Sequence, residues 1–121
     1  MIIYFFDTYA IIEIIVGNKN YEKYRDDKII TSVLNVIELH YALLKKYNKK
    51  FADNILLEYS KFIVPITLKD IAEANNFRLD NIKKRLSTAD AMGYVLAAKY
   101  NTKFLTGDKE FAGLNNVEFA K

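Results

Sequence analysis

The chain has 121 residues, of which 51% are hydrophobic and 27% charged, so its length and apolar content fit a single domain spanning residues 1–121. Cysteine is absent and histidine occurs once, which excludes a disulfide framework, a thiolate zinc site and a multi-histidine metal site. Eighteen Lys and Arg against fifteen Asp and Glu give a net charge of +3, a mild bias toward polyanionic partners that decides no function alone.

The chain has no sequence signal for a membrane or for secretion. The longest stretch without a charged residue has nine residues, 29–37, far short of the ~20 that a membrane-spanning helix needs. The first residues, MIIYFFD, place no basic segment ahead of the apolar run, as a signal peptide would. We therefore expect a cytoplasmic protein.

The first half of the chain predicts two strands and three helices. Residues 2–6 form an unbroken apolar run typical of a buried parallel strand, and the helix that follows ends at Gly17. Residues 28–31 predict a second strand, after which Ser32 caps a helix that extends to about residue 47. An amphipathic helix is expected over residues 51–61.

The second half of the chain predicts three more strands and two more helices. Residues 62–64 read as a strand that ends at Pro65, which cannot donate to a ladder. A helix begins at Thr67, and an Ala-rich helix is expected over residues 87–100. The last two predicted strands cover residues 103–105 and 117–119.

Strands that alternate with helices imply an α/β fold, in which a parallel sheet has helices on both faces. Ligands of such folds bind outside the carboxyl ends of the strands. Functional residues are therefore expected directly after the predicted strands.

Four acidic residues stand where such a site would form. Asp7 follows the first strand, and Asp108 follows the fourth strand after a Thr106-Gly107 turn. Asp90 lies in the first turn of the Ala-rich helix, and Glu38 lies among apolar residues inside another helix, where we expect it to be buried. Buried acids must be protonated, paired or bound to a cation. Since carboxylates are the available ligands, a bound ion would be a hard one, Mg²⁺ or Mn²⁺.

Each acid alone also has a structural explanation. Asp7 can cap the helix that it precedes, and Asp90 completes a capping-box pattern with Ser87. Asp108 is a common turn residue after Thr-Gly, and a salt bridge to a lysine would equally explain Glu38. The two roles are compatible, because a helix N-terminus favours the ionised carboxylate that a metal needs.

The order of these motifs resembles that of the PIN-domain ribonucleases, most of all their small single-domain VapC-type toxins. The resemblance covers nearly the whole chain and rests on Asp7-Thr8, Val36-Ile37-Glu38-Leu39, Ser87-Thr88-Ala89-Asp90-Ala91 and Leu105-Thr106-Gly107-Asp108 followed by Phe111. It implies a three-layer α/β/α sandwich around a mostly parallel sheet of about five strands.

The resemblance also implies an activity. A protein of this family would be an Mg²⁺- or Mn²⁺-dependent endoribonuclease that hydrolyses RNA with metal-activated water, and the toxin of a type II toxin–antitoxin pair. Asp7, Glu38, Asp90 and Asp108 would bind one or two ions, and the Thr106 hydroxyl would hold a water or a carboxylate there. A homodimer and a cognate antitoxin are implied as well. The alternative is a non-catalytic PIN-like module that binds RNA or protein.

Two residues depart from the family pattern. Glu110 stands where many members carry Asp, and we treat it, together with Ser87, as a candidate accessory residue. Tyr9 stands where relatives often carry a small residue, and it would narrow the pocket mouth, stack on a base or pack in the core.

The basic residues of the chain gather in two clusters. Lys83, Lys84 and Arg85 precede the Ser87 motif and are the candidate RNA-binding residues, with a solvated surface as the alternative. The other cluster, at residues 45–50, is better explained as solvated surface. His40 lies two positions from Glu38 and so on another side of its helix, which indicates a structural role.

Overall fold

A parallel sheet of four strands forms the centre of the structure, a computed structural model that describes residues 2–121. The strands lie in the order β2-β1-β3-β4 and all run in the same direction. Their bounds are Ile3–Phe6 for β1, Lys28–Ile30 for β2, Lys103–Thr106 for β3 and Val117–Phe119 for β4. Because every pair is parallel, the carboxyl ends of all four strands lie at one edge.

The prediction of a strand at residues 62–64 is wrong. Ile63 forms only an isolated parallel bridge with Thr31, in which Thr31 N–H donates to Phe62 (3.0 Å) and Val64 N–H donates to Thr31 (3.0 Å). The ladder cannot continue, because Ser32 already caps a helix and Pro65 has no N–H to donate. The sheet therefore has four strands rather than about five.

The helices agree with the predicted segments to within about two residues at each end. They are α1 (Thr8–Val16), α2 (Val33–Lys46), α3 (Lys49–Ser60), α4 (Leu68–Asp80) and α5 (Thr88–Lys99), and the 3₁₀ turns are η1 (Lys19–Tyr24), η2 (Ile82–Lys84) and η3 (Lys109–Phe111). None of the helices within residues 2–121 combines the length and the apolar character that a membrane crossing needs.

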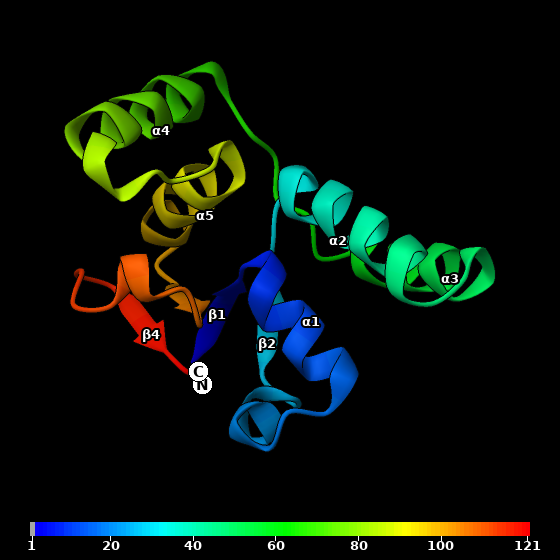
Figure 1. Cartoon of the computed structure of the whole chain (residues 1–121). Helices are drawn as coiled ribbons and strands as arrows, with labels where there is room; N and C mark the ends of the chain where they lie inside the picture. The colour runs from blue at the N-terminus through cyan, green and yellow to red at the C-terminus, as the bar shows by residue number, and fades with distance from the viewer. Residues whose placement is uncertain (1) are drawn as a thin grey trace.

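Alternation along β1 sends its side chains to the two faces of the sheet. Tyr4 and Phe6 pack in one apolar cluster with residues of α1, α2 and α3, whereas Phe5 packs in a second cluster with residues of α4 and α5. Figure 1 accordingly shows α4 and α5 together, apart from α2 and α3. The fold is the expected three-layer α/β/α sandwich.

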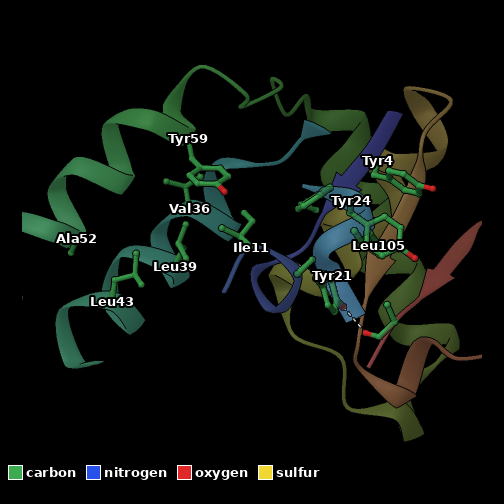
Figure 2. Packing of buried hydrophobic residues seen from close by; sticks show 13 residues of the cluster. Tyr4, Ile11, Tyr21, Tyr24, Val36, Leu39, Leu43, Ala52, Tyr59 and Leu105 are labelled. Atoms are coloured by element: carbon green, nitrogen blue, oxygen red, sulfur yellow. Dashed lines mark hydrogen bonds between the residues drawn. The ribbon is translucent and has the colours of Figure 1, made fainter. Parts of the chain in front are cut away.

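The cluster that contains Tyr4 also anchors the end of the chain (Figure 2). Tyr21 of η1 is fully buried in it, and its hydroxyl donates to the Ala120 carbonyl (2.5 Å). In addition, Ala120 N–H donates to the carbonyl of Thr106 (3.0 Å), the last residue of β3. These bonds hold the residues after β4 beside the carboxyl end of β3.

Gly93 lets α5 lie close against the sheet. A Cβ at this position would lie 2.7 Å from a ring carbon of Phe5 and 2.8 Å from a ring carbon of Phe104, and both rings are fully buried. Glycine is otherwise unfavourable inside a helix by about 1 kcal/mol. The close approach of the helix to the sheet explains its presence here.

We expect Gly93→Ala to destabilise the protein by about 1–3 kcal/mol, because the overlap with two buried rings outweighs the gain in helix propensity. Urea unfolding monitored by circular dichroism measures the change. In a Phe104→Leu background the same substitution should cost less, since the smaller side chain can yield. A Gly93→Ala protein as stable as the parent would contradict this packing argument.

Candidate active site

A pocket at the carboxyl edge of the sheet contains three of the four predicted acids. Asp7, Asp90 and Asp108 line this cavity of about 380 Å³, and its other lining residues are Thr8, Tyr9, Gly107, Lys109 and Lys121. The three aspartates come from the end of β1, the first turn of α5 and the end of β3. We call this cavity the acidic pocket.

Asp7 is the most buried of these acids, with 3% of its surface exposed. Its carboxylate caps α1 by accepting from Ala10 N–H (2.7 Å). Burial raises the pKa of Asp7 to about 7, and the charges of Asp90 and Asp108 add to the rise, while Ala10 N–H and the nearby Thr106 hydroxyl lower it. Burial thus disfavours the ionised form of Asp7, and the groups that lower its pKa offset this only in part.

Asp90 is oriented by a capping box at the start of α5. Its Oδ2 accepts from Ser87 N–H (3.1 Å), and the Ser87 hydroxyl accepts from Asp90 N–H (3.0 Å). Among residues 2–121, the other carboxylate oxygen has no hydrogen-bond partner, so it is free to face a ligand. Ser87 does not line the acidic pocket, and its contacts are those of a cap.

Asp108 caps the short turn η3, and Thr106 links it to Asp7. Its Oδ1 accepts from Glu110 N–H (2.9 Å), and its own N–H donates to the fully buried Thr106 hydroxyl (3.0 Å). The same hydroxyl lies close enough to Asp7 to lower its pKa. Glu110 takes part through its backbone, and its side chain does not line the pocket.

Glu38 is exposed, so the expectation that it is buried is wrong. The face of α2 that packs in the core carries Val36 and Leu39, and both are almost fully buried. Ile37, beside Glu38 in the sequence, is 61% exposed. The apolar side chain of Ile37 thus lies at the protein surface itself and does not bury the Glu38 carboxylate.

Glu38 is nevertheless connected to the acidic pocket through Thr8. The Thr8 hydroxyl donates to Glu38 Oε1 (2.8 Å) and accepts from the Asn35 side-chain amide (3.2 Å). Asn35 is buried and accepts from the Ser32 hydroxyl (2.6 Å). Sequence reasoning missed Asn35, whose signal is a polar residue on the apolar face of α2, one turn before Glu38.

Tyr9 packs against the core and also lines the pocket, whereas its stacking on a base stays a prediction. It is half-buried against Tyr21, with ring centroids 6.2 Å apart, and it also lines the acidic pocket. Its ring covers Gly107, where a Cβ would overlap the ring and would lie 2.7 Å from the Ala120 carbonyl oxygen. Gly107 is therefore needed for the close packing of this side of the pocket.

The predicted basic cluster does not line the acidic pocket. Lys84 donates to the Glu110 carbonyl (3.0 Å), and Arg85 lines a separate cavity of about 300 Å³. The lysines that do line the acidic pocket are Lys109 and Lys121. An RNA-binding role for Lys83, Lys84 and Arg85 stays a prediction.

The donor set of the pocket suits a hard divalent cation. Within residues 2–121, no three acidic or histidine side chains form a group that could hold a metal ion as they stand, so the fit rests on the type of donor atom. The acids present are all oxygen donors, and Asp90 and Asp108 each commit one oxygen to a backbone N–H. Mutual repulsion of the carboxylates, which contributes to the raised pKa of Asp7, is what a cation would relieve.

The raised pKa of Asp7 predicts how stability depends on pH in the metal-free protein. Between about pH 4 and pH 7 the folded protein holds a proton on Asp7 that the unfolded chain, with an ordinary pKa of 3.8, releases. Stability should therefore fall across this range as pH rises, by up to about 4 kcal/mol. Chemical unfolding in EDTA at several pH values measures this dependence.

Asp7→Asn should flatten this pH dependence, and the exposed Asp26→Asn should leave it unchanged. Equal pH dependence in the parent and Asp7→Asn proteins would contradict the shifted pKa.

Comparison with solved structures shows that the fold is known. A toxin–antitoxin complex from Klebsiella pneumoniae matches with a TM-score of 0.72 at 20% identity, over 94% of each chain. VapBC2 from Rickettsia felis bound to a promoter DNA fragment matches with a TM-score of 0.70 at 19% identity, over 99% of this chain and 100% of that one. DNA-bound VapBC from Salmonella typhimurium matches with a TM-score of 0.71 at 14% identity, over 98% of this chain and 97% of that one.

Among curated proteins, none has a sequence that matches significantly. The family model described as "PIN domain" matches residues 4–116, nearly the whole chain. This chain belongs to the PIN domain family.

Proposed function

We propose that the protein is a divalent-metal-dependent endoribonuclease and acts as the toxin of a type II toxin–antitoxin pair. The observation that carries the proposal is the acidic pocket, in which Asp7, Asp90 and Asp108 come together at the carboxyl edge of the sheet. This arrangement occurs in a chain of the PIN domain family. A substrate phosphodiester would lie at this pocket.

Asp7, Asp90, Asp108 and Glu38 would hold one or two Mg²⁺ or Mn²⁺ ions. Such an ion supplies a positive charge that activates water and stabilises the negative charge of the reacting phosphate. The chain contributes the orientation of the ligands: Ser87 N–H fixes Asp90, and Glu110 N–H fixes Asp108.

Thr106 acts as a positioning residue between two of these ligands. Its hydroxyl accepts from Asp108 N–H (3.0 Å) and lies near the Asp7 carboxylate, whose pKa it lowers. One buried side chain therefore couples the end of β1 to the turn after β3. Partners of this kind orient metal ligands and tune their affinity.

The proposal includes protein partners in the cytoplasm, an antitoxin and a second copy of the chain. The similar structures from Klebsiella pneumoniae and Rickettsia felis are described as toxin–antitoxin and VapBC2 assemblies. This chain also has large exposed apolar side chains on α3, α4 and η2: Leu57 is 75% exposed, Leu68 85%, Leu79 67% and Ile82 69%. Such surface favours contact with other proteins.

Cleavage of a mixed pool of structured RNA tests the activity. We expect the purified protein to cut RNA with Mn²⁺ and not with EDTA, and Asp90→Asn to lower the rate by at least about 100-fold. Asn can still accept the hydrogen bond from Ser87 N–H, so the cap should survive. Asp80→Asn, at the exposed end of α4, is the control and should cut normally. Full activity of Asp90→Asn would refute the proposed mechanism.

Titration calorimetry with Mn²⁺ tests the metal site without any RNA. We expect the parent protein to bind Mn²⁺ and Asp108→Asn to bind it about 10–100-fold more weakly, because a charged ligand is lost while the cap of η3 remains. Asp26→Asn should bind like the parent. Failure of the parent protein to bind Mn²⁺ would favour the non-catalytic module instead.

A further inference from the structure

Two lysines line the acidic pocket together with its three aspartates. Lys109 follows Asp108 directly, and Lys121 follows the strand β4. Both side chains are exposed, and within the described chain neither ammonium group has a salt-bridge or hydrogen-bond partner. Four other lysines have polar partners: Lys49, Lys69 and Lys99 pair with acids, and Lys84 donates to a carbonyl.

The backbone of Lys121 is fixed beside the pocket. Its carbonyl accepts from the Asn20 side-chain amide (2.9 Å), and the preceding Ala120 is bonded both to the Tyr21 hydroxyl (2.5 Å) and to Thr106 (3.0 Å). The ammonium group of Lys121 lies 6.0 Å from the ring centroid of Tyr9, which also lines the pocket. The backbone hydrogen bonds of Ala120 and Lys121 thus place the Lys121 side chain beside the acidic pocket.

The backbone of Lys109 is fixed as well. It is the first residue of η3, whose start is capped by Asp108, and its carbonyl accepts from Ala112 N–H (3.1 Å). Lys109 and Lys121 therefore lie at the pocket because of backbone geometry, while their side chains keep the freedom of exposed lysines.

The charges of the pocket require such cations if RNA is the substrate. Three aspartates in one cavity repel a phosphodiester, and the lysines of the lining offset that repulsion. A lysine that contacts an RNA phosphate also releases condensed counterions, which favours binding at low salt.

We propose that Lys109 and Lys121 form the phosphate-binding pair of the acidic pocket and hold the RNA backbone beside the bond that is cut. This inference rests on the proposed function, because it takes RNA as the substrate. It assigns the contact with the RNA phosphate to one lysine of η3 and one lysine after β4, in place of the cluster at residues 83–85.

Binding of a short, fluorescein-labelled single-stranded RNA tests the pair. The measurement uses Asp90→Asn protein with Mn²⁺, in which the RNA should stay intact, and fluorescence anisotropy at KCl concentrations between about 50 and 200 mM. Adding Lys109→Ala and Lys121→Ala should reduce the slope of log affinity against log salt by about 0.7 for each lysine.

The matched control replaces Lys28 and Lys103 by alanine in the same background. These lysines are exposed and are the first residues of β2 and β3, so they lie at the amino edge of the sheet, opposite the pocket. Their replacement removes the same amount of positive charge. The control should keep the slope of the Asp90→Asn protein. Thermal unfolding followed by circular dichroism checks that each variant is folded.

Three results would overturn the inference: an unchanged slope in the protein with Lys109→Ala and Lys121→Ala, equal loss of slope in both double variants, or no RNA binding by the Asp90→Asn protein. The nuclease activity is judged separately, by cleavage in the protein with Asp90 intact. A protein that cleaves RNA and binds it without need of Lys109 and Lys121 would contradict the phosphate-binding pair alone.

Discussion

The parallel pairing of β1 with β3 is the interaction on which the acidic pocket depends. Phe6 pairs with Leu105, and the ladder continues beyond β1 through Asp7 N–H, which donates to the Leu105 carbonyl (3.3 Å). Residues about a hundred positions apart are thereby placed side by side, so that the Thr106 hydroxyl lies near the Asp7 carboxylate and lowers its pKa. Slippage of this register by one residue would turn Asp7 toward the other face of the sheet.

The aspartates of the pocket are also helix caps, and the two roles support each other. Asp7 caps α1, Asp90 belongs to the capping box of α5, and Asp108 caps η3. A cap holds a carboxylate at a defined place and favours its ionised form, while the second oxygen can face the pocket. Burial acts in the opposite direction on Asp7, where it raises the pKa to about 7. In this site, the helix caps stabilise the ionised carboxylates, while burial and the repulsion between neighbouring aspartates destabilise them.

The outer parts of the site depend on side chains whose positions no local pattern specifies. Glu38 lies on an exposed side of α2 and is connected to the pocket by Thr8 and Asn35. Lys121 reaches the pocket because η1 and β3 anchor the residue before it. These connections join segments that are distant in the sequence, and periodicity or spacing carries no information about them.

The sequence by itself determined the alternation of strands and helices, the caps, the α/β/α class and three of the acids that line the pocket. Apolar periodicity and capping residues act over a few neighbours, so they can be read along the chain. The tertiary structure decided that residues 62–64 form a bridge and no strand, because Ser32 ends the neighbouring strand. It also decided that Glu38 is exposed, and that Lys109 and Lys121 line the pocket. Burial and charge proximity arise from packing between distant segments, and this is the physical reason why they had to be seen in three dimensions.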